Sequence, residues 1–186
     1  MRTAETTRTR VLNTALDALP DHGFGGLSVG RLASLTGMSK SGLIARFGDV
    51  ERLQIALVDH AAERFSASVI KPAFSASAKT PARLRALASA WLDWLDARRP
   101  CPLMQAAFES CALAGTAGEY ARAVRARFQP FVAGLARPAL GERAEAFAFS
   151  FEAIGLAAGL AALTGAEEGR ARAEAEYDQV FSRYGL

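Results

Sequence analysis

The chain has 186 residues, of which 51% are hydrophobic, with a net charge of +3 and two cysteines. A chain of this length and apolar content can bury a substantial core, which excludes wholesale disorder. The longest unbroken apolar run, Ala153 to Leu163, is shorter than the roughly 20 residues that span a bilayer. The N-terminus is polar and basic and resembles no signal peptide. We therefore expect a cytoplasmic protein with no membrane partner.

The sequence does not assemble the side chains of a catalytic or metal site. Cys101 and Cys111 lie far from His22 and His60 and show no zinc-ligand spacing. The sequence contains no glycine-rich phosphate loop and no acid pair with a reason to be buried. It predicts no enzyme, no metal and no cofactor. An alternative, a small helical enzyme using one of the cysteines, would need a partner histidine.

Helices are predicted throughout the chain. No segment alternates apolar and polar residues with a period of two, and Val and Ile are scarce beside Ala and Leu. A first helix carries apolar residues on one face from Val11 to Leu19 and stops within Pro20–Gly26. Phe24, in that stop, is expected to reach a small core with Leu32 and Phe47.

Two short helices follow with the spacing of a helix-turn-helix. They are predicted at about Val29–Leu35 and Lys40–Phe47, and Gly37 can adopt the positive φ that a tight turn between them requires. A longer helix is expected from about Asp49 toward Pro72. The fold class is therefore all-α from its first element.

The helix-turn-helix segment has a local positive charge. Between positions 28 and 46 it contains two arginines, one lysine and no acid, which favours a polyanionic partner. Short polar side chains in the first turn of the second helix would allow close approach to base edges. An ordinary helical hairpin with solvated charges has the same spacing, so the residues alone leave both readings open. The candidate DNA-binding residues are Ser28, Arg31, Ser39, Lys40, Ser41, Gly42 and Arg46.

The segment GFGGLSVGRLASLTGMSKSGLIARFGDVERL resembles the N-terminal DNA-binding domain of the TetR family of bacterial transcriptional regulators. The resemblance covers about Thr7 to Asp59 and implies a recognition helix at Lys40–Phe47 that binds double-stranded DNA. It also implies a homodimer formed through the C-terminal helices and a variable ligand-binding body. Two positions depart from the family pattern: Ile44 replaces a tyrosine that usually contacts phosphate, and Val50 replaces a frequent lysine.

A Ser-, Ala- and Pro-rich boundary at Pro72–Pro81 precedes the second part of the chain. The predicted domains are therefore a helix-turn-helix domain at 1–48, a connecting helix at 49–72, and an effector-binding and dimerisation domain at 80–186. The helices expected in the last domain are Arg83–Arg99, Leu103–Leu113, Glu119–Leu135 with a kink at Pro130, Glu142–Leu163 and Glu167–Tyr184.

Apolar side chains in this domain are candidates for an effector pocket between helices. Plain core packing explains each of them equally well, and the pocket is implied by the family resemblance. The implied ligand is a small, largely apolar effector. The candidate pocket residues are Trp91, Trp94, Met104, Phe108, Phe128 and Phe131.

The segment Glu145–Gly165 places bulky and small residues on adjoining faces of one helix. Gly155 and Gly159 are four residues apart and form a flat strip on which another helix can pack closely. Packing within the chain is a competing explanation, whereas the resemblance favours an intermolecular four-helix bundle with Glu174–Tyr184. The candidate dimer-interface residues are Phe151, Gly155, Gly159, Ala162, Tyr177 and Phe181.

These observations together predict an all-α, homodimeric transcriptional repressor that a small apolar effector releases from a palindromic operator. The alternative is a helical sensor or carrier of apolar molecules with impaired DNA binding, which Ile44 and Val50 motivate. The operator sequence, the effector, the sign of control, the regulated genes and any redox role of the cysteines do not follow from the sequence.

Overall fold

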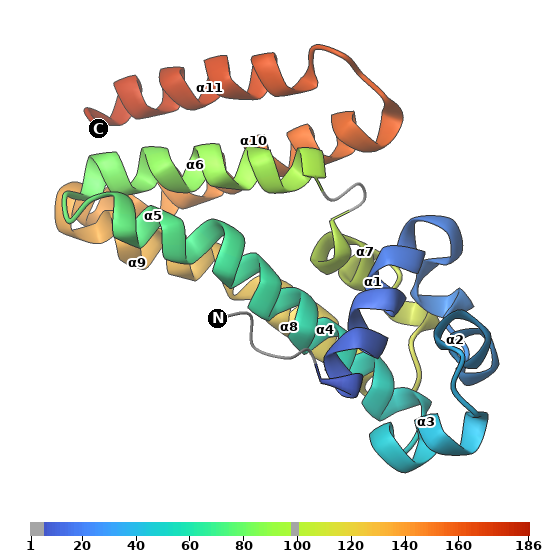
Figure 1. Ribbon diagram of the computed structural model, residues 1–186. Coiled ribbons are helices and arrows are strands. Elements are labelled where there is room, and N and C mark those ends of the chain that lie inside the picture. Colours follow the sequence, from blue (N-terminus) through green and yellow to red (C-terminus); the bar gives the residue numbers. More distant parts are fainter. Residues whose placement is uncertain (1–5, 98–100) are drawn as a thin grey trace. The chain divides into compact units, whose positions relative to one another are not determined.

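The structure, a computed structural model, describes residues 6–97 and 101–186, and no strand occurs among them (Figure 1). Both short helices of the predicted helix-turn-helix are present within a residue of their expected bounds. The helices are α1 (Thr7–Gly26), α2 (Val29–Thr36), α3 (Lys40–Phe47), α4 (Val50–Phe65), the π-helix η1 (Ser66–Ile70), α5 (Lys71–Ala76), α6 (Thr80–Ala97), α7 (Pro102–Phe108), the 3₁₀ turn η2 (Ser110–Ala112), α8 (Ala117–Ala126), α9 (Phe128–Leu140), the 3₁₀ turn η3 (Gly141–Arg143), α10 (Ala144–Thr164) and α11 (Gly169–Tyr184).

Several elements differ from the sequence prediction. The boundary predicted at Pro72–Pro81 is helical through η1 and α5 as far as Ala76. The helix predicted at Glu119–Leu135 is two helices, α8 and α9, and the break falls at Arg127. Pro130 lies in the first turn of α9, where the missing proline N–H would have no partner in any case, so it causes no kink. The last two residues of the helix predicted at Arg83–Arg99 lie outside the described residues.

The chain divides into two compact units. The first, here called the head, comprises the described residues up to Glu63 together with Pro102–Arg125. The second, the body, comprises Arg64–Cys101, apart from the undescribed residues, and Ala126–Leu186. The sequence-based boundaries assigned residues 102–125 to the C-terminal domain, whereas these residues pack with the N-terminal helices. Composition does not reveal this packing, because it depends on contacts distant in sequence.

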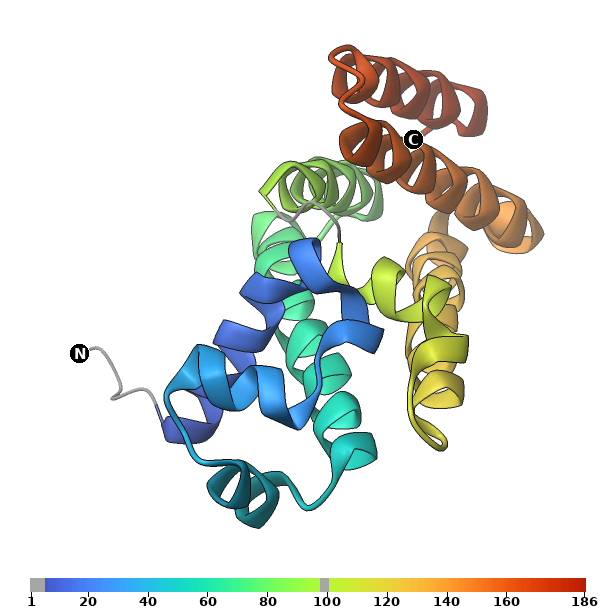
Figure 2. The ribbon, with the colours of Figure 1, turned by 90° about the vertical axis from the view of Figure 1, so that its right-hand side faces the viewer.

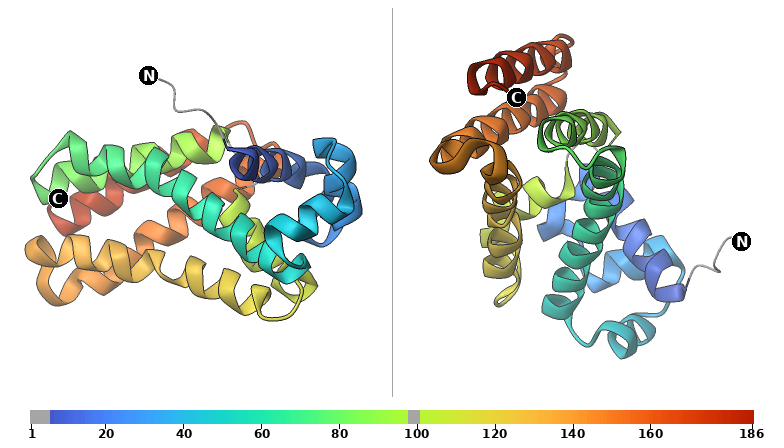
Figure 3. Two further views of the ribbon diagram at one scale, coloured as in Figure 1. Left: turned by 60° about the horizontal axis from the view of Figure 1, so that its bottom comes forward. Right: turned by 90° about the vertical axis from the view of Figure 1, so that its left-hand side faces the viewer.

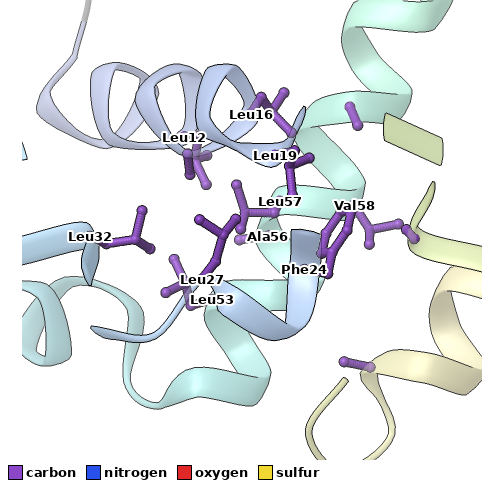
Figure 4. Close-up of a cluster of buried hydrophobic side chains, with 14 of the residues drawn as sticks. Leu12, Leu16, Leu19, Phe24, Leu27, Leu32, Leu53, Ala56, Leu57 and Val58 are labelled. Atoms are coloured by element: carbon purple, nitrogen blue, oxygen red, sulfur yellow. The ribbon is translucent and has the colours of Figure 1, made fainter. Parts of the chain in front are cut away.

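The head encloses one apolar core (Figure 4). The spaced leucines of α1 face the inner side of α4, and Phe24 lies in the same cluster, beside Val58, with no exposed surface. Leu32 of α2 and Phe47 of α3 belong to the same cluster, as the sequence predicts. Full burial of each such side chain favours folding by about 1.5–3 kcal/mol. The labelled core residues are Leu12, Leu16, Leu19, Phe24, Leu27, Leu32, Leu53, Ala56, Leu57 and Val58.

Polar side chains of α4 attach the segment 113–120 to the head. Gln54, which is 3% exposed, accepts a hydrogen bond from the Ala114 amide at 2.7 Å. Glu51 accepts bonds from both the hydroxyl and the amide of Thr116, each at 2.7 Å. These hydrogen bonds stabilise the ionised carboxylate and so lower the pKa of Glu51. The bond from the Thr116 hydroxyl has the larger effect and the bond from the Thr116 backbone N–H the smaller one. The segment is therefore held to the rest of the head by hydrogen bonds to α4 as well as by apolar packing.

A backbone break in α1 positions Phe24. Gly23 has φ +64° and ψ 173°, so the helix stops inside the predicted Pro20–Gly26 segment. Glu109, in the segment after α7, accepts a hydrogen bond from the amide of Phe24 at 2.7 Å. Gln105 of α7 donates to the other oxygen of Glu109 at 2.7 Å. The break therefore leaves an amide that α1 itself does not satisfy, and Glu109 satisfies it.

We predict that Glu109→Ala destabilises the head by about 1–3 kcal/mol, because it removes the acceptor of the Phe24 amide. Urea denaturation followed by circular dichroism measures the loss. Glu63→Ala is the control, since that carboxylate is 79% exposed and its ion pair with His60 is long at 3.9 Å. Equal stability of the two variants would contradict the role of Glu109.

The body is organised around aromatic rings from three helices. The ring of Trp91 in α6 lies 4.7 Å from that of Phe128 in α9 and stacks at 6.0 Å on Phe151 in α10. Helices α10 and α11 run side by side (Figures 2 and 3), and the Tyr177 hydroxyl of α11 donates to the Phe151 carbonyl at 3.0 Å. Such ring pairs stabilise a core by about 0.5–1.5 kcal/mol each beyond the area that they bury.

Gly155 lets α6 approach α10 closely. A Cβ atom at this position would collide with ring carbons of Trp91, a side chain that is itself only 2% exposed. The Trp91 ring therefore packs directly against the backbone of Gly155, a contact within one chain that any larger residue at this position would prevent.

We predict that Gly155→Ala destabilises the body by about 1–3 kcal/mol through overpacking against Trp91. Gly134→Ala in α9 is the matched control, because a Cβ there meets nothing within 4 Å. This control should stabilise the protein by up to about 1 kcal/mol, the usual helix preference of alanine over glycine. Thermal and urea unfolding compare the two, and a stabilising Gly155→Ala would refute the close approach.

The helical run Ala117–Thr164 is long and apolar enough, by length and composition, to cross a membrane. The core helices of soluble proteins have the same length and composition, so this run does not overturn the expectation of no membrane partner. The run is divided into α8, α9 and α10 by breaks at Arg127 and at Gly141, where φ is +56°. Only 33% of its apolar window is buried within the described chain. Apolar surface is therefore left uncovered, and much of it lies on α10.

Candidate nucleic-acid interface

Helices α2 and α3 begin in the same way. The Ser28 hydroxyl accepts a hydrogen bond from the Arg31 amide at 3.2 Å, and the Ser39 hydroxyl accepts one from the Gly42 amide at 3.0 Å. Each serine is thus an N-cap, worth about 1 kcal/mol to its helix. Gly37 between the helices has φ +68°, which confirms the predicted positive-φ turn. The local sequence therefore fixes both starts and the turn between them.

The orientation of α3 is set by its buried side. Leu43 is 1% and Phe47 is 7% exposed, and both pack in the head core. The Arg8 guanidinium of α1 covers the Phe47 ring at 4.8 Å. With 3.6 residues per turn, Ser41 and Ala45 then lie on the opposite side and are exposed. Figures 1 and 2 show α3 at the periphery of the head.

The helix-turn-helix carries three exposed cations. Arg31, Lys40 and Arg46 are all exposed. The Lys40 side chain extends back toward α2, so that its Nζ atom would lie 3.6 Å from a Cβ at Gly30. The ammonium group is thus placed beside the positive N-terminal end of a helix, an arrangement that favours an anion between them. Arg31 Nη1 lies 3.3 Å from a ring nitrogen of His22.

The structure brings together all of the candidate DNA-binding residues in the head. Six are exposed and Gly42 is partly covered, with Ser39 next to it. Two further residues of α3 are exposed: Ile44, which the sequence analysis noted only as a departure from the family pattern, and Ala45, which it did not name. Their signal is their spacing, since neither shares the helix face of Leu43 and Phe47.

The candidate pocket residues are divided between the two units. Trp91, Trp94, Phe128 and Phe131 are rings of the body, and Trp94 Nε1 donates to the Cys101 sulfur at 3.3 Å. Met104 and Phe108 belong to α7 in the head, where Met104 is buried and Phe108 is 72% exposed. Within either unit alone, the six residues do not form one lining.

The candidate interface residues lie mostly inside the subunit. Phe151, Tyr177 and Phe181 are at most 3% exposed, and Gly155 is covered by Trp91. Gly159 is also buried, while Ala162 is partly exposed. Gly155 therefore packs against a ring of its own chain, and the explanation by intrachain packing that the sequence left open describes this contact.

The exposed side of α10 is apolar instead. Phe149 is 66%, Leu160 is 61% and Leu163 is 48% exposed, and Ala153 and Ala157 lie exposed between them. Positions 149, 153, 157 and 160 recur at helical spacing and form one face, here called the outer α10 face. A hollow beside it, between α10 and α11, is lined mainly by alanines, together with charged residues that include Glu168 and Glu176.

Solved structures of transcriptional regulators share this fold. The chain matches a TetR-family regulator from Streptomyces coelicolor with a TM-score of 0.85 and 20% identity, covering 97% of this chain and 96% of that one. A TetR regulator from Legionella pneumophila matches with a TM-score of 0.80 and 16% identity, over 96% and 98% of the two chains. AibR, solved with isovaleryl coenzyme A and operator DNA, matches with a TM-score of 0.66 and 22% identity, over 81% and 84%.

No protein-family model and no curated protein matches the chain. The resemblance inferred from Thr7–Asp59 nevertheless extends to the arrangement of helices over nearly all of the chain, and two of the three matched proteins are named as TetR transcriptional regulators. The chain has the fold of the TetR-family transcriptional regulators.

Proposed function

We propose that the protein is a DNA-binding transcriptional regulator of the TetR type, in which α3 enters the major groove. The observation that carries this proposal is the outer side of α3, which is exposed and free of acids and belongs to a motif with three exposed cations, Arg31, Lys40 and Arg46. In such a complex the first helix of the motif crosses the phosphate backbone and the second contacts base edges. Repression from a cytoplasmic location is the proposed mode of control.

A homodimer is the proposed assembly, and the outer α10 face is its proposed interface. This face takes the place of the buried residues that the sequence suggested. In a monomer, water contacts the exposed side chains of Phe149, Leu160 and Leu163, which is unfavourable. Packing against the same helix of a second copy would exclude this water. Two α3 helices must then lie about 34–36 Å apart to reach adjacent major grooves of a palindromic operator.

A small, largely apolar effector is the proposed ligand of the body. The partly exposed rings of Phe128 and Phe131 supply the kind of surface that such ligands contact. Binding that favours a different spacing of the two α3 helices would weaken operator binding. The second candidate function is a sensor or carrier with impaired DNA binding. It is favoured by Ile44, whose exposed apolar side chain cannot make the phosphate contact of a tyrosine.

The first test is DNA binding. In an electrophoretic shift assay with the DNA upstream of its own gene, the protein should bind more tightly than to random DNA of equal length. We predict that Lys40→Ala and Arg46→Ala weaken binding and that Arg46→Ala reduces the slope of affinity against salt by about one phosphate contact. Because Lys40 lies beside the start of α2, where a phosphate would bind, we expect Lys40→Ala to reduce the salt slope by a similar amount. If Lys40→Ala instead weakened binding to the specific site alone and left binding to random DNA unchanged, Lys40 would contact a base.

Arg172→Ala provides the charge-matched control, since this arginine lies on α11 and pairs with Glu168 at 2.6 Å. It should leave DNA affinity unchanged. Absence of preferential binding to any DNA selected from a random pool would favour the sensor alternative over the regulator.

The assembly has its own test. We predict that Leu160→Asp converts dimers to monomers in sedimentation velocity experiments, because a carboxylate would be buried without a partner. Ala139→Asp, at an exposed position of α9 outside the outer α10 face, should leave the dimer intact. A dimer that survives Leu160→Asp would exclude this face as the interface.

A further inference from the structure

The outer side of α3 offers few polar groups that are free to reach a base, and this observation deepens the proposed function on which it rests. The Ser39 hydroxyl caps the helix and lies 3.1 Å from the Ser41 hydroxyl. Lys40 extends toward Gly30 of α2, away from the centre of the outer side. The polar side chains of the first turn are therefore mostly engaged in holding the motif or lie where a phosphate would bind.

One apolar side chain occupies the space beyond them. Ile44 is 43% exposed, although two neighbouring apolar residues of α3 are at most 7% exposed. It follows Lys40 by four residues and Ser41 by three, so it lies one helical turn farther along the same side. Ala45 beside it is small and exposed, which leaves room for the helix to approach a groove closely.

The chemistry of the major groove identifies a partner for this side chain. Each base pair presents donors and acceptors there, but among the four bases only thymine presents an apolar group, its C5-methyl. An isoleucine cannot pair with a donor or an acceptor, and contact with one would leave that polar group unsatisfied. We propose that Ile44 is a specificity-determining residue that selects thymine by contact with its C5-methyl group.

The experiment removes the methyl group from the base and the side chain from the protein, one at a time. A binding sequence is first selected from random duplexes with the wild-type protein. Each thymidine in it is then replaced by deoxyuridine, which keeps the base-pairing edge and loses only the methyl. We expect at least one position per half-site at which deoxyuridine weakens wild-type binding about fourfold, the effect of exposing one methyl-sized group. Ile44→Ala should be insensitive to that replacement.

Leu35→Ala is the matched control. Leu35 is as exposed as Ile44, at 44%, but lies on α2, so this variant should keep the full sensitivity to deoxyuridine. Circular dichroism verifies that both variants fold, as expected for exposed positions. Equal deoxyuridine penalties for wild type and Ile44→Ala would overturn the inference while leaving DNA binding intact. Failure of the wild type to select any DNA would overturn the proposed function and this inference with it.

Discussion

The burial of Leu43 and Phe47 in the head core decides which side of α3 faces outward. An eight-residue helix has little stability alone, so its direction depends on these two anchors and on the Ser39 cap. Once both anchors are buried, helix geometry leaves Ser41, Ile44 and Ala45 outside. Every proposal about DNA follows from this rotational setting, because a turn of 100° about the helix axis would present a different set of side chains.

The head is held together by more than the three helices that its sequence motif suggests. Glu109 satisfies the amide at the α1 break, and Gln54 and Glu51 fix the segment before α8. These contacts join residues about 60 to 85 positions apart. The segment from α7 to the start of α8 is thus part of the head, although along the chain it lies between helices of the body.

Helix α10 illustrates how one sequence pattern serves two faces. Its apolar residues are distributed all around the helix axis, which is typical of a helix that other protein segments surround completely. The side that carries Gly155 packs on Trp91 of the same chain, while the side that carries Leu160 remains exposed. The small residues are explained by intrachain ring packing, and the bulky exposed residues are the ones that call for a partner.

Local signals in the sequence were sufficient for the helix-turn-helix, because capping serines, a positive-φ glycine and helical spacing act within a few residues. They also placed Phe24 correctly in the core. They were insufficient for the body, where Gly155 and Phe151 suggested a dimer surface and the tertiary structure buried both. A glycine strip records only that something packs closely, and the identity of the neighbour depends on contacts such as that with Trp91, which is 64 residues away. The attachment of residues 102–125 to the head likewise depends on distant partners, which no local pattern specifies.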